Sequence, residues 1–99
     1  MAIKMNRRPT HPGAILREDT LPAIELTTSE FAEALGVSRR TVSEILNERA
    51  RITVDLAHRI GRALGMSPDI WLRMQQAVDL YDAHAKNKAV YSQIKRIAA

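Results

Sequence analysis

The sequence has no cysteine among its 99 residues. This absence excludes a disulfide framework or a zinc finger and is compatible with a reducing cytoplasm. Aromatic residues make up only 4% of the chain, so its core must consist mainly of Leu, Ile, Val, Ala and Met. No apolar run approaches the length of a membrane span or a signal peptide. We therefore expect one small cytoplasmic domain without a membrane partner.

Catalytic constellations are also missing. The three histidines, His11, His58 and His84, are far apart in the sequence, and no group of residues has metal-ligand spacing. There is no nucleophile elbow and no phosphate loop. The sequence therefore predicts a protein that is not an enzyme, with no catalytic or metal residues, no cofactor and no small-molecule substrate.

Positive charge is present and unevenly distributed. The formal net charge is +4, and residues 39–62 hold six arginines against three acids. Smaller basic groups lie near both ends: Lys4, Arg7 and Arg8, and Lys86, Lys88, Lys95 and Arg96. This balance favours an anionic partner such as nucleic acid, although a solvated basic surface would give the same totals.

The segment from Thr28 to Leu46 predicts two short helices joined by a tight turn. Apolar or small residues recur at helical spacing: Phe31, Ala32, Leu35, Val37, Val42 and Ile45. Gly36 can adopt the left-handed conformation that ends the first helix, and Ser38 is a good N-cap for the second. The pattern predicts a helix-turn-helix, whose second helix can enter the DNA major groove. An ordinary amphipathic helical hairpin is the alternative.

The polar residues of this segment are the candidate DNA contacts. They are Thr28, Ser38, Arg39, Arg40, Thr41, Ser43, Glu44, Asn47, Arg49 and Arg51. Arg39 and Arg40 begin the second helix, where each guanidinium fork suits guanine O6 and N7. Glu44 suits the cytosine amino group, or it pairs with Arg40 one helical turn earlier. Hydroxyls at helix N-termini and the later arginines suit phosphates.

The rest of the chain predicts helices and no strand of useful length. The expected helices cover about residues 12–21, 28–35, 39–46, 54–64 and 68–85. Pro22 is expected to end the first helix because it disfavours helical geometry at Leu21. Thr27 and Glu30 have capping-box spacing, and Ser67-Pro68-Asp69 is a strong start signal. The prediction is an all-α fold of five helices.

The last predicted helix carries more apolar surface than one side of a surface helix needs. Its apolar stripe contains Ile70, Trp71, Met74, Val78 and Tyr81. Either a small core uses all of this surface, or these residues form a homodimer interface. A two-fold dimer would read two DNA half-sites about 34 Å apart, which is one helical turn.

Three blocks of sequence resemble the HigA-type antitoxins, a branch of the lambda-repressor-like (Xre-type) helix-turn-helix family. The blocks read HPGAILRE at residues 11–18, LGVSRRTVSEILN at residues 35–47 and ALGMSPDIWL at residues 63–72. The middle block marks only the superfamily, whereas the outer two point to the antitoxin branch. The resemblance covers about residues 11–85. It leaves residues 1–10 as a flexible arm and residues 86–99 as a tail without a match.

This resemblance implies a five-helix, lambda-repressor-like DNA-binding domain with a C-terminal helix extended for dimerisation. It also implies an antitoxin that neutralises a small RelE-like toxin, which is an mRNA-cleaving ribonuclease. Such antitoxins repress their own operon as dimers on a palindromic operator. A free-standing Xre-type repressor without a toxin is the alternative, and a toxin-binding module that does not bind DNA is a third possibility.

One position departs from the family pattern. Family members usually have Asn-Gly after the recognition helix, whereas this chain has Asn47-Glu48. A left-handed conformation at a residue with a Cβ costs roughly 1 kcal/mol or more. We therefore expect a differently shaped loop at this point, which weakens the phosphate assignments of Arg49 and Arg51.

Overall fold

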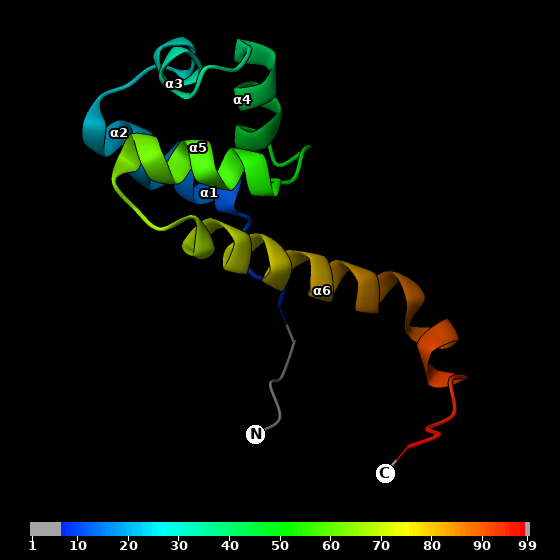
Figure 1. Cartoon of the computed structure of the whole chain (residues 1–99). Coiled ribbons are helices and arrows are strands. Elements are labelled where there is room, and N and C mark those ends of the chain that lie inside the picture. Colours follow the sequence, from blue (N-terminus) through cyan, green and yellow to red (C-terminus); the bar gives the residue numbers. More distant parts are fainter. Residues whose placement is uncertain (1–6, 99) are drawn as a thin grey trace.

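The computed structural model describes residues 7–98, and the described part is all-helical (Figure 1). Its elements are α1 (Pro12–Ile15), η1 (Leu16–Thr20), α2 (Leu21–Ile24), α3 (Thr28–Leu35), α4 (Arg39–Leu46), α5 (Val54–Leu64) and α6 (Pro68–Ser92). Because α1, η1 and α2 follow one another without a break, the predicted five-helix fold is confirmed. Of the arm predicted over residues 1–10, residues 1–6 lie outside the described residues.

The first helical segment continues through Pro22, so the prediction that it ends near Leu21 is wrong. The Leu21 N–H donates to the carbonyl of Leu16, five residues earlier, which makes η1 a π-helical turn. Pro22 then lies in the first turn of α2, where a missing N–H costs little. The segment ends at Glu25, which has a left-handed φ of 55°.

The ends of α3 and α4 follow the sequence signals. The Thr27 hydroxyl accepts from the Glu30 N–H at 3.1 Å, and the Glu30 carboxylate accepts from the Thr27 N–H at 2.9 Å. These hydrogen bonds lower the pKa of Glu30. Gly36 ends α3 with a φ of 71°, and the Ser38 side chain caps α4. The turn between the two helices is therefore fixed by local residues.

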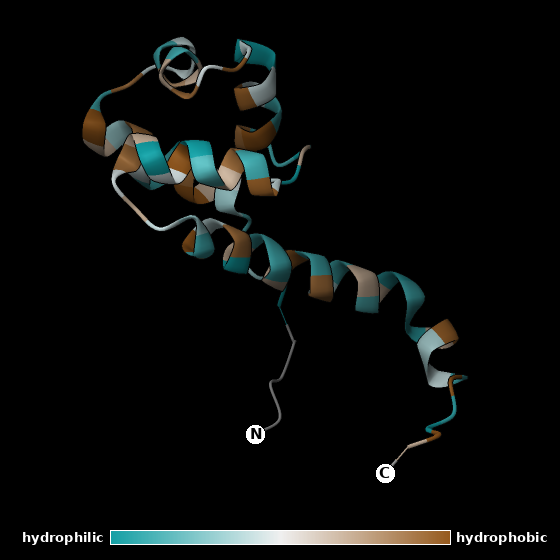
Figure 2. Cartoon of the chain, in the orientation of Figure 1, coloured by the Kyte–Doolittle hydropathy of each residue, from teal (hydrophilic) through white to brown (hydrophobic). Residues whose placement is uncertain are grey.

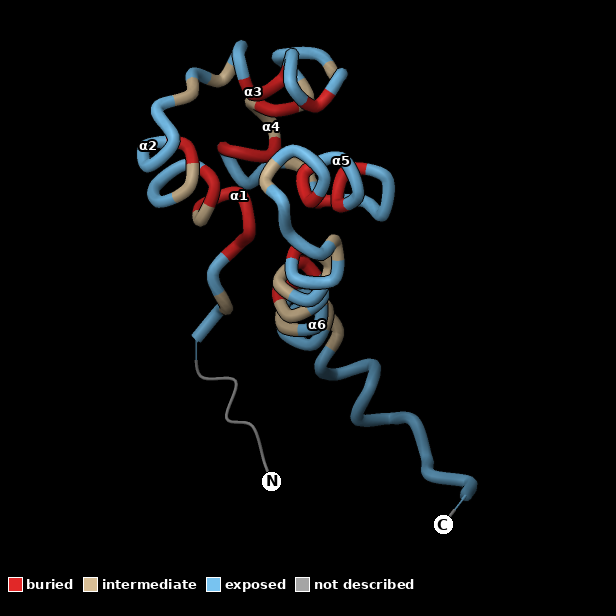
Figure 3. The backbone as a smooth tube through the Cα atoms, turned by 60° about the vertical axis from the view of Figure 1, so that its left-hand side comes forward, coloured by how far each residue is buried: buried red, intermediate tan, exposed pale blue. Residues whose placement is uncertain are grey.

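The core lies where α3, α4 and α5 meet the first helical segment and the start of α6 (Figure 3). Its buried side chains are Leu16, Leu21, Phe31, Ala32, Leu35, Val42, Ile45, Leu46, Ile52, Leu56, Ala57, Ile60 and Trp71. Both helices of the motif turn their apolar residues into this core, which leaves their polar residues in solvent.

The last helix, α6, is longer than the sequence predicts and continues to Ser92 instead of ending near Ala85. Residues 69–92 contain no glycine or proline, so nothing local stops the helix. It is kinked at Asn87, whose φ of −116° and ψ of 20° are not helical. Beyond the core its far end projects away from the other helices and still carries hydrophobic residues (Figures 1 and 2).

The proposed dimer residues of α6 divide into two groups. Trp71 and Val78 are each only 1% exposed within the single chain, so neither has surface left for a partner. The structure contradicts their assignment to a dimer interface and makes them core residues. Ile70 is exposed, and Met74 and Tyr81 are half-buried, so these three still have surface to offer.

Candidate nucleic-acid interface

The α4 helix has two distinct faces and lies at the end of the molecule opposite α6 (Figure 1). Its buried face consists of Val42, Ile45 and Leu46. Its other face carries the candidate DNA contacts: Arg39 and Arg40 are exposed, and Thr41, Ser43 and Glu44 are half-buried. An eight-residue helix that buries one face and exposes basic side chains at its N-terminus has the form of a recognition helix.

The N-terminus of α4 is held by a pair of hydroxyls. Ser38 Oγ accepts from the Thr41 N–H at 3.1 Å and lies 2.8 Å from Thr41 Oγ. This contact fixes the first turn, which carries the two arginines. Arg39 has no ion pair among the described residues. Arg40 Nε lies 3.8 Å from Glu44 Oε1, so the ion-pair role of Glu44 is observed.

The Arg40–Glu44 ion pair does not remove Arg40 from the candidate surface. The Arg40 side chain is 89% exposed, and an exposed pair one helical turn apart contributes only about 0.3–0.5 kcal/mol. A guanine base could therefore replace Glu44 as the partner at little cost. Both roles predicted for Glu44 are geometrically open.

The loop after α4 keeps the left-handed backbone that the family glycine would adopt. Glu48 has a φ of 60°, so the expectation of a differently shaped loop is wrong. The Asn47 amide donates to the Ser43 carbonyl at 2.9 Å, and the Arg49 N–H donates to the Glu44 carbonyl at 2.8 Å. These bonds satisfy carbonyls at the end of the helix, and they explain how the loop tolerates a glutamate.

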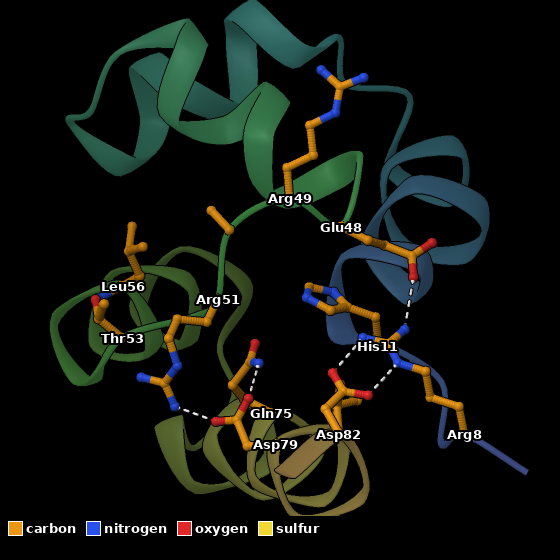
Figure 4. A pocket seen from close by; sticks show the side chains of 12 residues that line it. Arg8, His11, Glu48, Arg49, Arg51, Thr53, Leu56, Gln75, Asp79 and Asp82 are labelled. Atoms are coloured by element: carbon orange, nitrogen blue, oxygen red, sulfur yellow. Dashed lines mark hydrogen bonds and ion pairs between the residues drawn. The ribbon is translucent and has the colours of Figure 1, made fainter. Parts of the chain in front are cut away.

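The two arginines of this loop point in different directions (Figure 4). Arg49 extends away from α6 and forms no ion pair with the other described residues. Arg51 points to α6 and pairs with the Asp79 carboxylate. A DNA phosphate must compete with the Asp79 carboxylate for Arg51, whereas no carboxylate of the described residues competes for Arg49. The phosphate roles of both remain predictions.

Gln75, Asp79 and Asp82 of α6, which the sequence did not single out as site residues, lie around this loop together with Arg8 of the N-terminal basic group. Gln75 is buried, accepts from the Ile52 N–H at 2.8 Å and donates to Asp79 at 3.0 Å. Arg8 binds both carboxylate oxygens of Asp82, at 2.8 and 3.0 Å. The partners in these contacts are 23, 4 and 74 residues apart, so only the Gln75–Asp79 pair has spacing that a sequence pattern could reveal.

These contacts perturb several ionisable groups. The Arg8 guanidinium lowers the pKa of Asp82, and the Asp82 carboxylate in turn raises the pKa of Arg8. Burial opposes ionisation of Asp79, but hydrogen bonds from Arg51 and Gln75 outweigh it and lower its pKa. The carboxylates of α6 therefore stay charged and hold their arginines.

His11 is the N-cap of α1, as its place before Pro12 suggests. Its Nδ1 atom accepts from the Gly13 N–H at 2.9 Å, and the residue is buried. Burial is the largest cause that lowers the pKa of His11, with Glu48 partly opposing it. The imidazole therefore acts as a neutral hydrogen-bond acceptor in the fold.

Within residues 7–98 there is no group of three His, Asp or Glu side chains that could hold a metal ion. None of the helices described between Pro12 and Ser92 is long and apolar enough to cross a membrane.

The fold and the exposed face of α4 define a helix-turn-helix protein, in which α3 and α4 are the two helices of the motif. A family model described as Helix-turn-helix matches residues 23–71.

Comparison with known sequences and structures shows to which family of helix-turn-helix proteins the chain belongs. The chain is 40% identical over 79 residues to antitoxin HigA-1 of Vibrio cholerae, covering 80% of this chain and 74% of that protein. The structure is similar to that of Pseudomonas aeruginosa antitoxin HigA with the higBA promoter, with a TM-score of 0.86, 36% identity and coverage of 92% and 100%. It is also similar to antitoxin GraA in complex with its operator, with a TM-score of 0.88, 35% identity and coverage of 99% and 100%. The chain belongs to the HigA family of helix-turn-helix antitoxins, which confirms the resemblance read from its sequence.

Proposed function

We propose that the chain is a cytoplasmic antitoxin that neutralises a RelE-like ribonuclease toxin and represses its own operon. It binds a palindromic DNA operator as a dimer. The observation that carries the DNA-binding part is the exposed basic start of α4, in a fold that closely matches HigA and GraA structures containing DNA. The toxin partner follows from family membership.

In this mechanism α4 enters the major groove with its N-terminal end first. Arg39 and Arg40 read base edges, with Glu44 and Ser43 one turn later. Thr28, Ser38 and Thr41 contact phosphates near helix N-termini, where backbone N–H groups also favour an anion. Asn47, Arg49 and Arg51 contact the backbone beyond α4 and fix the register. Ile70, Met74 and Tyr81 contribute to the dimer interface.

The DNA-binding roles are tested by comparing Arg40→Ala with Arg49→Ala. Arg40→Ala is expected to cost roughly 1–3 kcal/mol on the operator and to relax specificity at one base position. Arg49→Ala is expected to weaken binding to every sequence alike and to lower the salt slope by about one unit. Equal losses for both variants on operator and random DNA would show that Arg40 does not read a base.

The toxin is tested by purifying the tagged chain from its host at low and at high salt. A small basic protein retained at high salt, with a palindromic promoter fragment released at that salt, supports the antitoxin-repressor. Recovered DNA without any protein partner supports a free-standing repressor instead.

A further inference from the structure

The last turn of the recognition helix contacts the first helical segment at two consecutive carbonyl groups. Gly13 lies so close that a Cβ built on it would be 1.8 Å from the Ile45 carbonyl oxygen. Arg17 Nη1 donates to the next carbonyl, that of Leu46, at 2.6 Å. The C-terminal end of α4 therefore packs against α1 through the backbone at Gly13 and is hydrogen-bonded to η1 through the Arg17 guanidinium.

Glu48 holds this guanidinium in place. Its carboxylate lies 3.3 Å from Arg17 Nη1 and 3.6 Å from Arg8 Nη1. The Arg17 and Glu48 side chains are 39% and 32% exposed, so solvent screens their pair less than it screens a fully exposed one. Glu48 also has a left-handed backbone, with a φ of 60°, which is unfavourable for a residue with a Cβ. The chain thus has a strained glutamate at the position where the family usually has glycine.

The positive charge of Arg17 is favourable at the C-terminal end of α4. Exposed C-terminal carbonyls carry partial negative charge, and a cation placed against them is stabilising. A carboxylate beside that cation fixes which way it points. Because α4 is a short helix of eight residues, we expect a shift at its C-terminal end to change the direction of the arginines at its N-terminal end.

We propose that Arg17 and Glu48 are positioning residues for base recognition, acting as a guanidinium–carboxylate clamp on the last turn of α4. This inference rests on the proposed function, because it concerns how that function achieves sequence specificity. Two other roles are alternatives to the clamp. Arg17 could contact a DNA phosphate directly, and Glu48 could act only as a negative charge that repels DNA.

The experiment measures the ratio of affinities for two DNA duplexes of equal length. One duplex is selected from a random library by the wild-type protein, and the other is a scrambled version of it. Both affinities are measured over a salt series for Arg17→Ala, Arg17→Lys, Glu48→Gln and Glu18→Gln. Glu18 is the matched control, because it also lies 3.7 Å from Arg17 but is 68% exposed and makes no recorded contact with α4.

The clamp predicts a selective loss. Arg17→Ala is expected to lower the affinity ratio about tenfold, the equivalent of one hydrogen bond to a charged group. Glu48→Gln is expected to lower it roughly threefold, in keeping with a partly exposed ion pair. Arg17→Lys, which keeps the charge and one donor, restores part of the ratio, and Glu18→Gln leaves it unchanged. The salt slope on scrambled DNA stays as in the wild type.

Each other role gives a different result. If Arg17 contacts phosphate, Arg17→Ala weakens both duplexes alike and lowers the salt slope by about one unit. If Glu48 only repels DNA, Glu48→Gln strengthens both alike. A lower melting temperature with an unchanged ratio shows a purely structural role; any of these three results overturns the clamp. A wild-type protein that selects no sequence contradicts the proposed function itself.

Discussion

Residues 11–78 and residues 79–98 differ in how far their apolar side chains are buried. In the first region nearly every element contributes buried residues to one core (Figure 3). In the second region none of the described residues is buried. Its exposed apolar residues are Leu80, Val90, Tyr91, Ile94 and Ile97. The same helix, α6, belongs to both regions, because its start is part of the core and its end projects from it.

From this difference we expect folding to depend on the first region, and assembly to use the exposed apolar residues of the second region together with Ile70 and Met74. The first region has the caps, the glycine turns and the core that a domain needs to fold alone. The second region keeps apolar surface in water, which is unfavourable unless a partner covers it. Substitutions in the two regions should therefore change different measurements.

The largest effect is expected at Trp71, where α6 enters the core. Trp71→Ala should lower the free energy of unfolding by about 3–5 kcal/mol, because it leaves a large cavity. Urea denaturation followed by circular dichroism measures this change. Trp71→Phe is the control: Trp71 Nε1 has no hydrogen-bond partner among residues 7–98, so this variant loses only volume and should cost far less. If Trp71→Ala lowers the free energy of unfolding by less than 1 kcal/mol, Trp71 does not stabilise the core as predicted.

The next largest effect is expected where α1 meets the recognition helix. Gly13→Ala should cost about 1–3 kcal/mol, because its methyl group would overlap the Ile45 carbonyl and push the backbones apart. Gly65→Ala is the matched control. Gly65 has a left-handed φ of 67°, and a Cβ added there would meet no atom of the other described residues within 4 Å beyond its chain neighbours, so this variant tests backbone strain without a clash. Because Gly65→Ala carries its own cost of left-handed strain, a Gly13→Ala variant that melts no lower than the wild type would show that close approach at Gly13 is unimportant.

The sequence predicts most of the first region because its signals are local. The Thr27 capping box, the Ser38 cap and the turn at Gly36 each depend on residues within one helical turn. The start of α6 at Ser67-Pro68 is equally local. The prediction that Pro22 ends the first helix is wrong because a π-helical turn precedes this proline and lets the helical segment continue. A rule that considers only the proline and the residue before it does not include such a turn.

The candidate site could be predicted only in part. The exposed face of α4 follows from periodicity, so Arg39 and Arg40 could be placed correctly on the surface. The contacts of Arg8 with Asp82 and Arg51 with Asp79 could not, because they join residues that only the tertiary fold brings together. Two residues of the α6 stripe, Trp71 and Val78, could not be assigned correctly for a similar reason. Periodicity shows that Trp71 and Val78 face something apolar, but not whether that surface is the chain's own core.

A smaller effect is expected from acidification, again confined to the first region. Because burial lowers the pKa of His11 in the folded state, the unfolded state binds a proton at higher pH than the folded state does. Stability is therefore fully present above the unfolded pKa, near 6.5, and falls as the pH drops toward the folded pKa. His11→Asn keeps a capping side chain without a titrating group. Its melting temperature should fall less than that of the wild type between pH 7.5 and 5.5, and an equal fall would assign the dependence to other groups.

The smallest effect is expected in the second region, and it separates folding from assembly most directly. Val90 is 58% exposed on the projecting end of α6, and valine and serine have similar helix propensities. Val90→Ser should therefore change the free energy of unfolding by less than about 0.5 kcal/mol in dilute protein. If the second region assembles with another chain, the same substitution should weaken that association, and sedimentation over a concentration series would detect the change. A cost above 1 kcal/mol in protein dilute enough to be monomeric would instead mean that this end of α6 packs on the core, and the two regions would then be one.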